Sequence, residues 1–158
     1  MTKVQKRTRL KNFDYKGYYR YYLTINTNYK IKFFTNKEIF QQVRKILKNL
    51  SEKYGFAVWV YCFMPNHLHF LVEGKKKDSD LKKFMALFKQ KSSYYFKKKT
   101  AKKLWQENYY EHVLRKDEDT IKVVKYILNN PVRADLVENY YEYPCSGSFA
   151  IKDLKDLL

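Results

Sequence analysis

Apolar residues recur along the chain with two different periods, and the period separates expected strands from expected helices. Residues 18–25, 57–64 and 67–73 are rich in β-branched and aromatic side chains, which is typical of strands. Pro65 and Asn66 separate the last two segments, and this pair favours a tight turn because proline presets one backbone dihedral and asparagine tolerates the next. The pattern therefore predicts a β-hairpin around this turn.

Apolar residues spaced three or four positions apart predict helices over residues 37–54 and 80–98. Asn36 precedes the first helix as an expected N-cap, because its side-chain oxygen can accept a free backbone N–H. Asp78 or Ser79 is expected to do the same for the second helix.

A short strand is predicted over residues 109–113, and a third helix follows it. Asp117 or Asp119 is the expected N-cap of this helix, which continues to about Asn130. Pro131 is expected to end the helix, because a proline disfavours helical geometry in the residue before it.

The order strand, helix, strand, strand, helix, strand, helix predicts an α+β fold of the ferredoxin-like class. We expect an antiparallel sheet with helices mainly on one face, an open second face and a C-terminal helix that carries a tyrosine. Residues 1–158 are expected to form a single domain, with a basic N-terminal arm over residues 1–12 and a tail over residues 135–158.

The strongest compositional signal is the net charge of +17, from 33 Lys and Arg against 16 Asp and Glu. Such a charge favours a polyanionic partner, and nucleic acid is the commonest one, although a lysine-rich surface can also be merely solvated. The 16 tyrosines and 11 phenylalanines add aromatic side chains that could stack on unpaired bases. The sequence has neither a membrane-spanning apolar run nor a signal-peptide core, so a cytoplasmic protein is expected.

Two pairs of residues carry candidate chemistry. His67 and His69 alternate with Leu68 in a predicted strand, so both imidazoles should point to one face and could bind a divalent metal. A polar sheet face is the simpler alternative. Tyr126 and Asn130 are four residues apart in a predicted helix and should share a face, but Asn130 could equally be a C-terminal cap.

Five segments along the chain resemble a known family, and the first is the expected opening strand with Gly17, Tyr18, Tyr19 and Thr24. Residues 63–71 read Phe-Met-Pro-Asn-His-Leu-His-Phe-Leu and are similar to the His-hydrophobic-His motif of single-tyrosine (HUH) transposases of the IS200 type. The similarity is greatest to the REP-associated tyrosine transposases, because residues 126–134 resemble that branch's tyrosine helix with its Asn-Pro-Val-Arg-Ala ending. Residues 105–115 and 143–148 also match, with Cys145 as a departure where an aromatic residue is usual.

The resemblance implies a metal-dependent endonuclease and strand transferase that acts on single-stranded DNA. It implies that His67, His69 and Asn130 bind Mg²⁺ or Mn²⁺ and that Tyr126 is the nucleophile, which forms a 5′-phosphotyrosine. Because imidazoles must be neutral to bind a metal, activity is expected to fall below about pH 6.5. The expected partner is single-stranded or hairpin DNA close to the nucleoid, and a homodimer is one expected assembly.

Basic residues are the candidate DNA contacts. They are Arg7, Arg9, Lys75, Lys76, Lys77, Lys82, Lys89 and Arg133. Two alternatives stay open: a non-catalytic module of the same fold that binds hairpin DNA or RNA, and a metal-dependent phosphodiesterase that uses activated water in place of a tyrosine.

Overall fold

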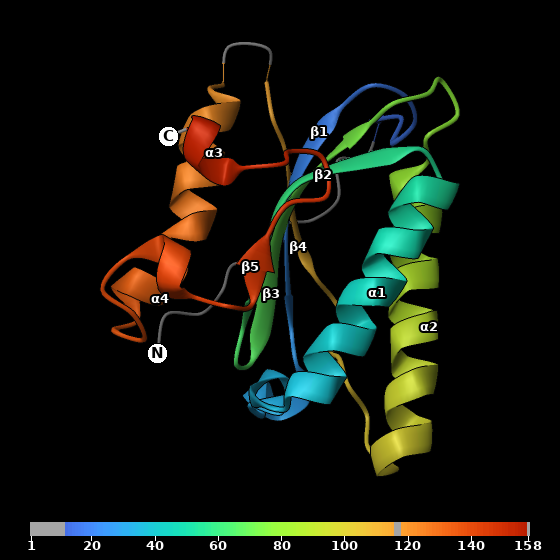
Figure 1. Cartoon of the computed structure of the whole chain (residues 1–158). Helices are drawn as coiled ribbons and strands as arrows, with labels where there is room; N and C mark the ends of the chain where they lie inside the picture. Colours follow the sequence, from blue (N-terminus) through green and yellow to red (C-terminus); the bar gives the residue numbers. More distant parts are fainter. Residues whose placement is uncertain (1–11, 116–117, 158) are drawn as a thin grey trace.

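A five-stranded antiparallel sheet with the strand order β4-β1-β3-β2-β5 forms the centre of the computed structural model, which describes residues 12–115 and 118–157 (Figure 1). The strands are β1 (Arg20–Asn26), β2 (Phe56–Met64), β3 (His67–Gly74), β4 (Tyr110–Val113) and β5 (Ser146–Gly147). The helices are α1 (Lys37–Lys53), α2 (Leu81–Thr100), α3 (Thr120–Leu128) and α4 (Asn130–Arg133). Four short 3-10 segments are η1 (Asn28–Lys30), η2 (Phe33–Thr35), η3 (Tyr140–Glu142) and η4 (Leu154–Leu157). The predicted α+β, ferredoxin-like class is confirmed, and β5 is a strand that the sequence did not predict.

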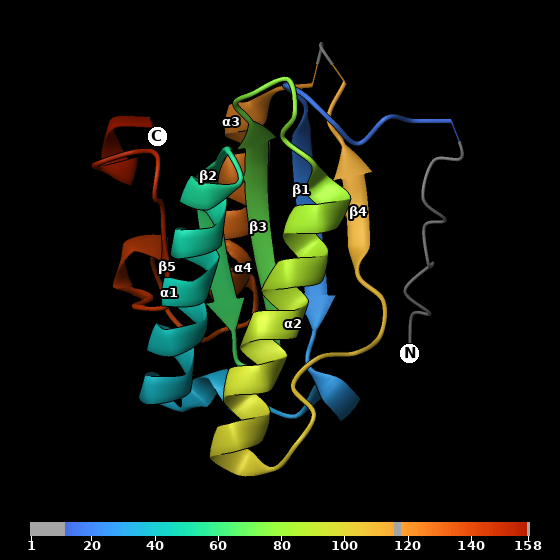
Figure 2. The ribbon, with the colours of Figure 1, turned by 90° about the vertical axis from the view of Figure 1, so that its right-hand side faces the viewer.

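The main hydrophobic core lies between one face of the sheet and the pair α1 and α2, which run side by side across it (Figure 2). Leu68 and Phe70 of β3 belong to this core and are fully buried. Strand alternation then puts the side chains of His67 and His69 on the opposite face, as the sequence predicted.

Side-chain caps begin α1, α2 and α3, as expected, although at α2 the capping residue differs from the prediction. Asn36 caps α1 by accepting a backbone N–H from the first turn. The cap of α2 is Asp80, and not Asp78 or Ser79. The Ser79 hydroxyl instead accepts the backbone N–H of Lys76 at 3.0 Å and donates to the Gly55 carbonyl at 2.7 Å.

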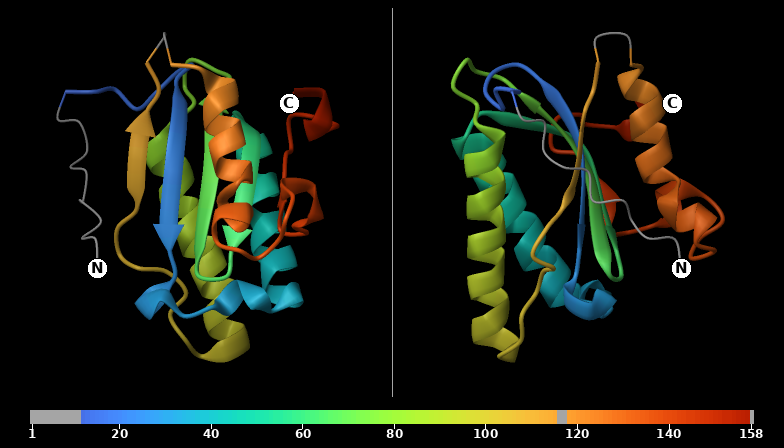
Figure 3. Two further views of the ribbon diagram at one scale, coloured as in Figure 1. Left: turned by 90° about the vertical axis from the view of Figure 1, so that its left-hand side faces the viewer. Right: turned by 180° about the vertical axis from the view of Figure 1, so that it is seen from behind.

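The second face of the sheet is covered by α3, so the prediction of an open face is wrong (Figure 3). A smaller apolar cluster fills this side, with Val60 and Leu71 from the sheet and Val124 and Ile127 from α3. The register of β2 against β3 shifts between Val58 and Val60. This bulge places Val58 in the main core but Val60 in the smaller cluster. Val60 is therefore part of the apolar surface on which α3 packs.

The chain does not leave helical structure at Pro131, which corrects the expected helix end. Helix α3 ends at Leu128, and α4 restarts at Asn130 with Pro131 in its first turn. Proline is tolerated there because the first turn has no internal acceptor for its missing N–H. Asp119 caps α3, whereas Asp117 and the N-terminal residues 1–11 lie outside the described residues.

Candidate metal and nucleophile site

The histidine pair sits in the middle of the sheet, because β3 is flanked by β1 and β2. The registers place His67 opposite Asn26 and His69 opposite Thr24 of β1. The two imidazole rings are 4.7 Å apart between centroids and almost perpendicular. Both residues are half-buried on the sheet face that α3 covers, and the strand holds the two imidazoles close together there.

Each histidine has its Nδ1 atom engaged by neighbouring oxygen atoms. The Nδ1 atom of His69 lies 2.9 Å from the hydroxyl of Tyr22 and 2.9 Å from that of Thr24. The Nδ1 atom of His67 lies 2.6 Å from Oδ1 of Asn66, which can only accept, so the ring must donate there. Among the described residues neither Nε2 atom has a hydrogen-bond partner, which leaves both available as ligands.

Burial lowers the pKa of both histidines well below the usual value. Desolvation, aided by the charge of Lys30, lowers the pKa of His67 to about 4. Desolvation, aided by His67 and Arg133, lowers the pKa of His69 to about 3. Both rings are therefore neutral throughout the physiological range, and any loss of metal binding through their protonation is now expected well below pH 6.5.

Helix α3 brings Tyr126 to the histidines through an intermediate ring. The ring of Tyr22 lies 6.0 Å from that of His69 and 6.3 Å from that of Tyr126, between centroids. Tyr126 itself is 54% exposed, so its hydroxyl can be reached from solvent. Burial raises the pKa of Tyr22 to about 12, so the phenol of Tyr22 stays protonated at neutral pH.

Arg133 of α4 connects the tyrosine with the asparagine. Its guanidinium donates to the backbone carbonyl of Tyr126 at 2.7 Å and to Oδ1 of Asn130 at 2.9 Å, and it lies 4.0 Å from the centre of the Tyr126 ring. The sequence suggested Arg133 as a DNA contact, and the structure adds that this side chain holds Tyr126 and Asn130 together.

The donor atoms at this site suit a hard or borderline divalent cation. His67 and His69 offer neutral Nε2 atoms, and Asn130 offers an amide oxygen. An amide oxygen has two lone pairs, so the bond from Arg133 leaves one for a cation. Within the described ranges no group of three or more His, Cys, Asp or Glu residues could hold a metal.

The other basic candidates lie in three different places. Lys75, Lys76 and Lys77 are exposed in the loop after β3, where Lys75 also pairs with Glu73 at 3.2 Å. Lys82 and Lys89 are on α2, which covers the sheet face opposite to the histidines. Arg7 and Arg9 fall outside the described residues. Those of the predicted basic residues that the structure describes therefore do not form one surface around the histidines.

Sequence reasoning missed Tyr22 and Thr24 as neighbours of His69. Their spacing of two residues indicates a shared face of β1, and this signal was available. It was not sufficient, because only the register between β1 and β3 shows that this face meets His69.

The match to a protein family covers most of the chain. Residues 16–130 match the family model of IS200-like transposases, so the chain belongs to this family and is an enzyme of the transposase class. No helix in the described ranges is both long enough and apolar enough to cross a membrane.

Two curated relatives refine the comparison within this family. A Haemophilus influenzae protein described as a candidate REP-associated tyrosine transposase is 28% identical over 138 residues, which span 80% of this chain and 78% of the relative. The REP-associated tyrosine transposase of Escherichia coli K12 is 23% identical over 138 residues, with 84% and 81% covered.

Two solved structures share the fold. One is a REP-associated tyrosine transposase bound to a REP hairpin, with a TM-score of 0.74 and 21% identity over 88% of this chain and 81% of the other. The second is a candidate transposase from Deinococcus radiodurans R1, with a TM-score of 0.53 and 17% identity over 85% and 95% of the two chains.

Proposed function

We propose that this transposase nicks single-stranded DNA next to a hairpin and transfers the strand through Tyr126. The observation that carries the proposal is the convergence of His69, Tyr22 and Tyr126, which come from β3, β1 and α3. The ring of Tyr22 lies about 6 Å from each of the other two rings, between centroids. A relative with the same fold is bound to a REP hairpin, which supports a hairpin-containing substrate. The proposal places the protein in the cytoplasm, close to chromosomal DNA.

Nicking, the first half of the proposed reaction, is one covalent step, and strand transfer reverses it with a different 3′-hydroxyl. The Tyr126 hydroxyl loses its proton and its oxygen forms a bond to the phosphorus of a DNA phosphodiester. The bond between phosphorus and the 3′ oxygen breaks, and that oxygen takes up a proton to give a free 3′-hydroxyl. The phosphotyrosine retains the energy of the ester, so a second strand can be joined without ATP.

His67, His69 and Asn130 would hold Mg²⁺ or Mn²⁺ in this proposal. The cation would supply Lewis-acid polarisation of the phosphate and neutralise developing charge. The protein's own part is orientation: Tyr22 and Thr24 fix the ring of His69, and Arg133 fixes Tyr126 relative to Asn130. Because both imidazoles are neutral, no proton has to leave them before a cation binds.

The test uses end-labelled single-stranded hairpins from the DNA flanking the gene, incubated with Mn²⁺ and run on a denaturing gel. Wild type should give a slowly migrating protein–DNA adduct that disappears with EDTA and in Tyr126→Phe. Tyr141→Phe is the matched control, because Tyr141 is similarly exposed at 60% and should leave the adduct unchanged. Cleavage that persists in Tyr126→Phe would instead favour the phosphodiesterase that activates water.

A non-catalytic hairpin-binding module is the second candidate. The observation in its favour is that Arg133 already contacts the expected nucleophile and the expected amide ligand. Its guanidinium lies over the Tyr126 ring and donates to Oδ1 of Asn130. A gel shift with hairpin DNA that needs no metal, together with no adduct from any flanking fragment, would support this candidate.

A further inference from the structure

A second concave site opens at the far end of the same sheet. It has a volume of about 870 Å³ and lies where β1 begins, β4 ends and α3 begins. Its lining includes Tyr18, Arg20 and Thr120 but none of the histidines, Tyr126 or Asn130. It is therefore separate from the metal and nucleophile site.

Aromatic side chains form one wall of this cavity. Tyr18 is 64% exposed and Tyr19 is 43% exposed, just after Gly17, which adopts a φ of +106° that other residues rarely reach. Phe13 supports the wall by packing edge-on against Tyr19 at 4.7 Å between centroids. Exposed aromatic rings beside a cavity are the typical platform for an unpaired base.

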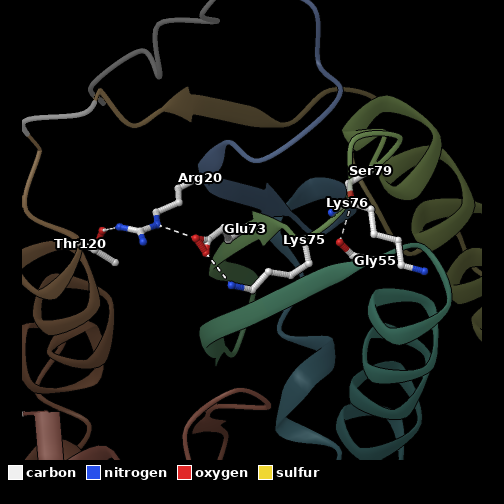
Figure 4. A network of polar contacts seen from close by, with 7 residues as sticks. All are labelled: Arg20, Gly55, Glu73, Lys75, Lys76, Ser79 and Thr120. Atoms are coloured by element: carbon white, nitrogen blue, oxygen red, sulfur yellow. Dashed lines mark hydrogen bonds and ion pairs between the residues drawn. The ribbon is translucent and has the colours of Figure 1, made fainter.

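The charges around the cavity favour a phosphate. Glu73 is neutralised by Arg20 at 3.0 Å and Lys75 at 3.2 Å, and Arg20 also donates to Thr120 (Figure 4). In contrast, the side chains of three further lining cations have no ion pair or hydrogen bond with any residue of the described ranges. These are Lys16, Lys77 and Arg115.

Glu118 is the remaining anion of the lining. Its carboxylate accepts from the Arg115 backbone N–H at 2.9 Å and contacts His112 at 2.9 Å, and these bonds hold its pKa below the usual value. One partnered carboxylate against three unpaired cations leaves the cavity electropositive, as an anionic ligand requires.

The cavity is within reach of a DNA strand held at Tyr126. Thr120, on its rim, precedes Tyr126 by six residues of α3, or about 9 Å of helix rise. Glu73 follows His69 by four residues of β3, or about 13 Å. A stacked strand rises about 3.4 Å per nucleotide, so these lengths correspond to about three nucleotides.

We propose that this cavity binds an unpaired nucleotide of the single-stranded DNA, about three positions from the phosphate that Tyr126 attacks. The base stacks on Tyr18 or Tyr19, and its phosphate pairs with Lys16, Lys77 or Arg115. The position of the nucleotide relative to the attacked phosphate rests on the proposed function. The test does not, because binding can be measured without metal or cleavage.

The probe is a labelled ten-nucleotide thymidine strand, compared in EDTA by fluorescence anisotropy with a strand of equal length that carries abasic residues. Wild type should bind the thymidine strand at least about fivefold more tightly, because each base stacked on an aromatic ring contributes that much or more. Tyr18→Ala with Tyr19→Ala should remove this preference without weakening abasic binding. Tyr126→Phe should retain it, even if adduct formation fails in wild type.

Tyr94→Ala is the matched control, because Tyr94 is 66% exposed but lies on α2, on the other side of the sheet. Tyr18→Trp guards against misfolding and should keep or increase the base preference. The proposal is overturned if wild type binds both strands equally, if the double alanine variant keeps the preference, or if it loses affinity for both strands alike.

Discussion

The hydroxyls of Tyr22 and Thr24 beside His69 lead to a specific prediction about the affinity of the site for Mn²⁺. The Nδ1 atom carries one proton in the ligand form and can donate it to one acceptor at a time. Tyr22 and Thr24 are equally close to Nδ1, each at 2.9 Å. Either hydroxyl can therefore replace the other, and the effects of removing them should not add.

Tyr22→Phe or Thr24→Val alone should weaken Mn²⁺ binding by no more than about threefold, because one acceptor remains. Such a change is close to the lower end of a net hydrogen-bond contribution, about 0.5 kcal/mol. The double variant should lose about 10- to 100-fold, which is typical when a metal-binding histidine loses its orienting partners. Without those partners the ring can rotate or carry its proton on Nε2, which then cannot bind a cation.

The assay is a titration of free Mn²⁺ by electron paramagnetic resonance at pH 7.5 without DNA. Phe keeps the aromatic ring of Tyr22, and Val keeps the β-branched shape that suits a strand, so the fold should be retained. Thr24→Ser in the Tyr22→Phe background restores one hydroxyl and should recover most of the affinity. The reasoning is refuted if the double variant stays within twofold of wild type, or if either single variant already shows the full loss.

Three further predictions follow from the geometry. The folded pKa is about 4 for His67 and about 3 for His69, against about 6.5 unfolded, so stability without metal should fall as the pH drops from 6.5 to 4, by about 3 kcal/mol for each histidine. Denaturant melts should show about half of this pH dependence in His67→Gln, and an equal dependence in both proteins would exclude His67 as a cause. Mn²⁺ affinity should stay constant from pH 8 to 5. Arg133→Gln should slow adduct formation about tenfold, because Tyr126 loses its cation–π and hydrogen-bond partner. The assay is a single turnover at saturating Mn²⁺, and an unchanged rate would show that Arg133 does not position the nucleophile. Phe63→Ala should cost about 3–5 kcal/mol of unfolding free energy in urea, because Phe63 is fully buried against Phe34 and other rings, and a loss under 1 kcal/mol would contradict this packing.

Local chemistry explains which parts of the fold the sequence could predict. The direction of His67 and His69 in β3 could be predicted from the sequence. Because Leu68 must face the core, strand alternation puts both histidines on the opposite face. The cap of α2 was ambiguous because Asp78, Ser79 and Asp80 can all accept a backbone N–H. In the structure the Ser79 hydroxyl accepts from the Lys76 backbone N–H and donates to the distant Gly55 carbonyl, and Asp80 caps the helix.

The candidate site was less predictable, because its groups meet only through packing between distant elements. The apolar surface on which α3 packs depends on the bulge between Val58 and Val60. No residue type in β2 identifies that bulge from the sequence alone. The start of α4 after Asn129 separates Tyr126 from Asn130, which were expected on one helix.

Arg133 restores the connection that the break in the helix removes. One guanidinium contacts the Tyr126 ring, the Tyr126 carbonyl and the Asn130 amide, and its charge also acts on His69. The guanidinium is planar, so it can stack on the Tyr126 ring while its single Nη2 atom donates to both oxygens. An ammonium group could donate to both oxygens but has no plane to stack on the ring. Arg133→Lys should therefore fail to restore the adduct rate lost in Arg133→Gln, although it keeps the charge. Full activity in Arg133→Lys would mean that charge alone matters here, and that the geometry joining Tyr126 to Asn130 does not.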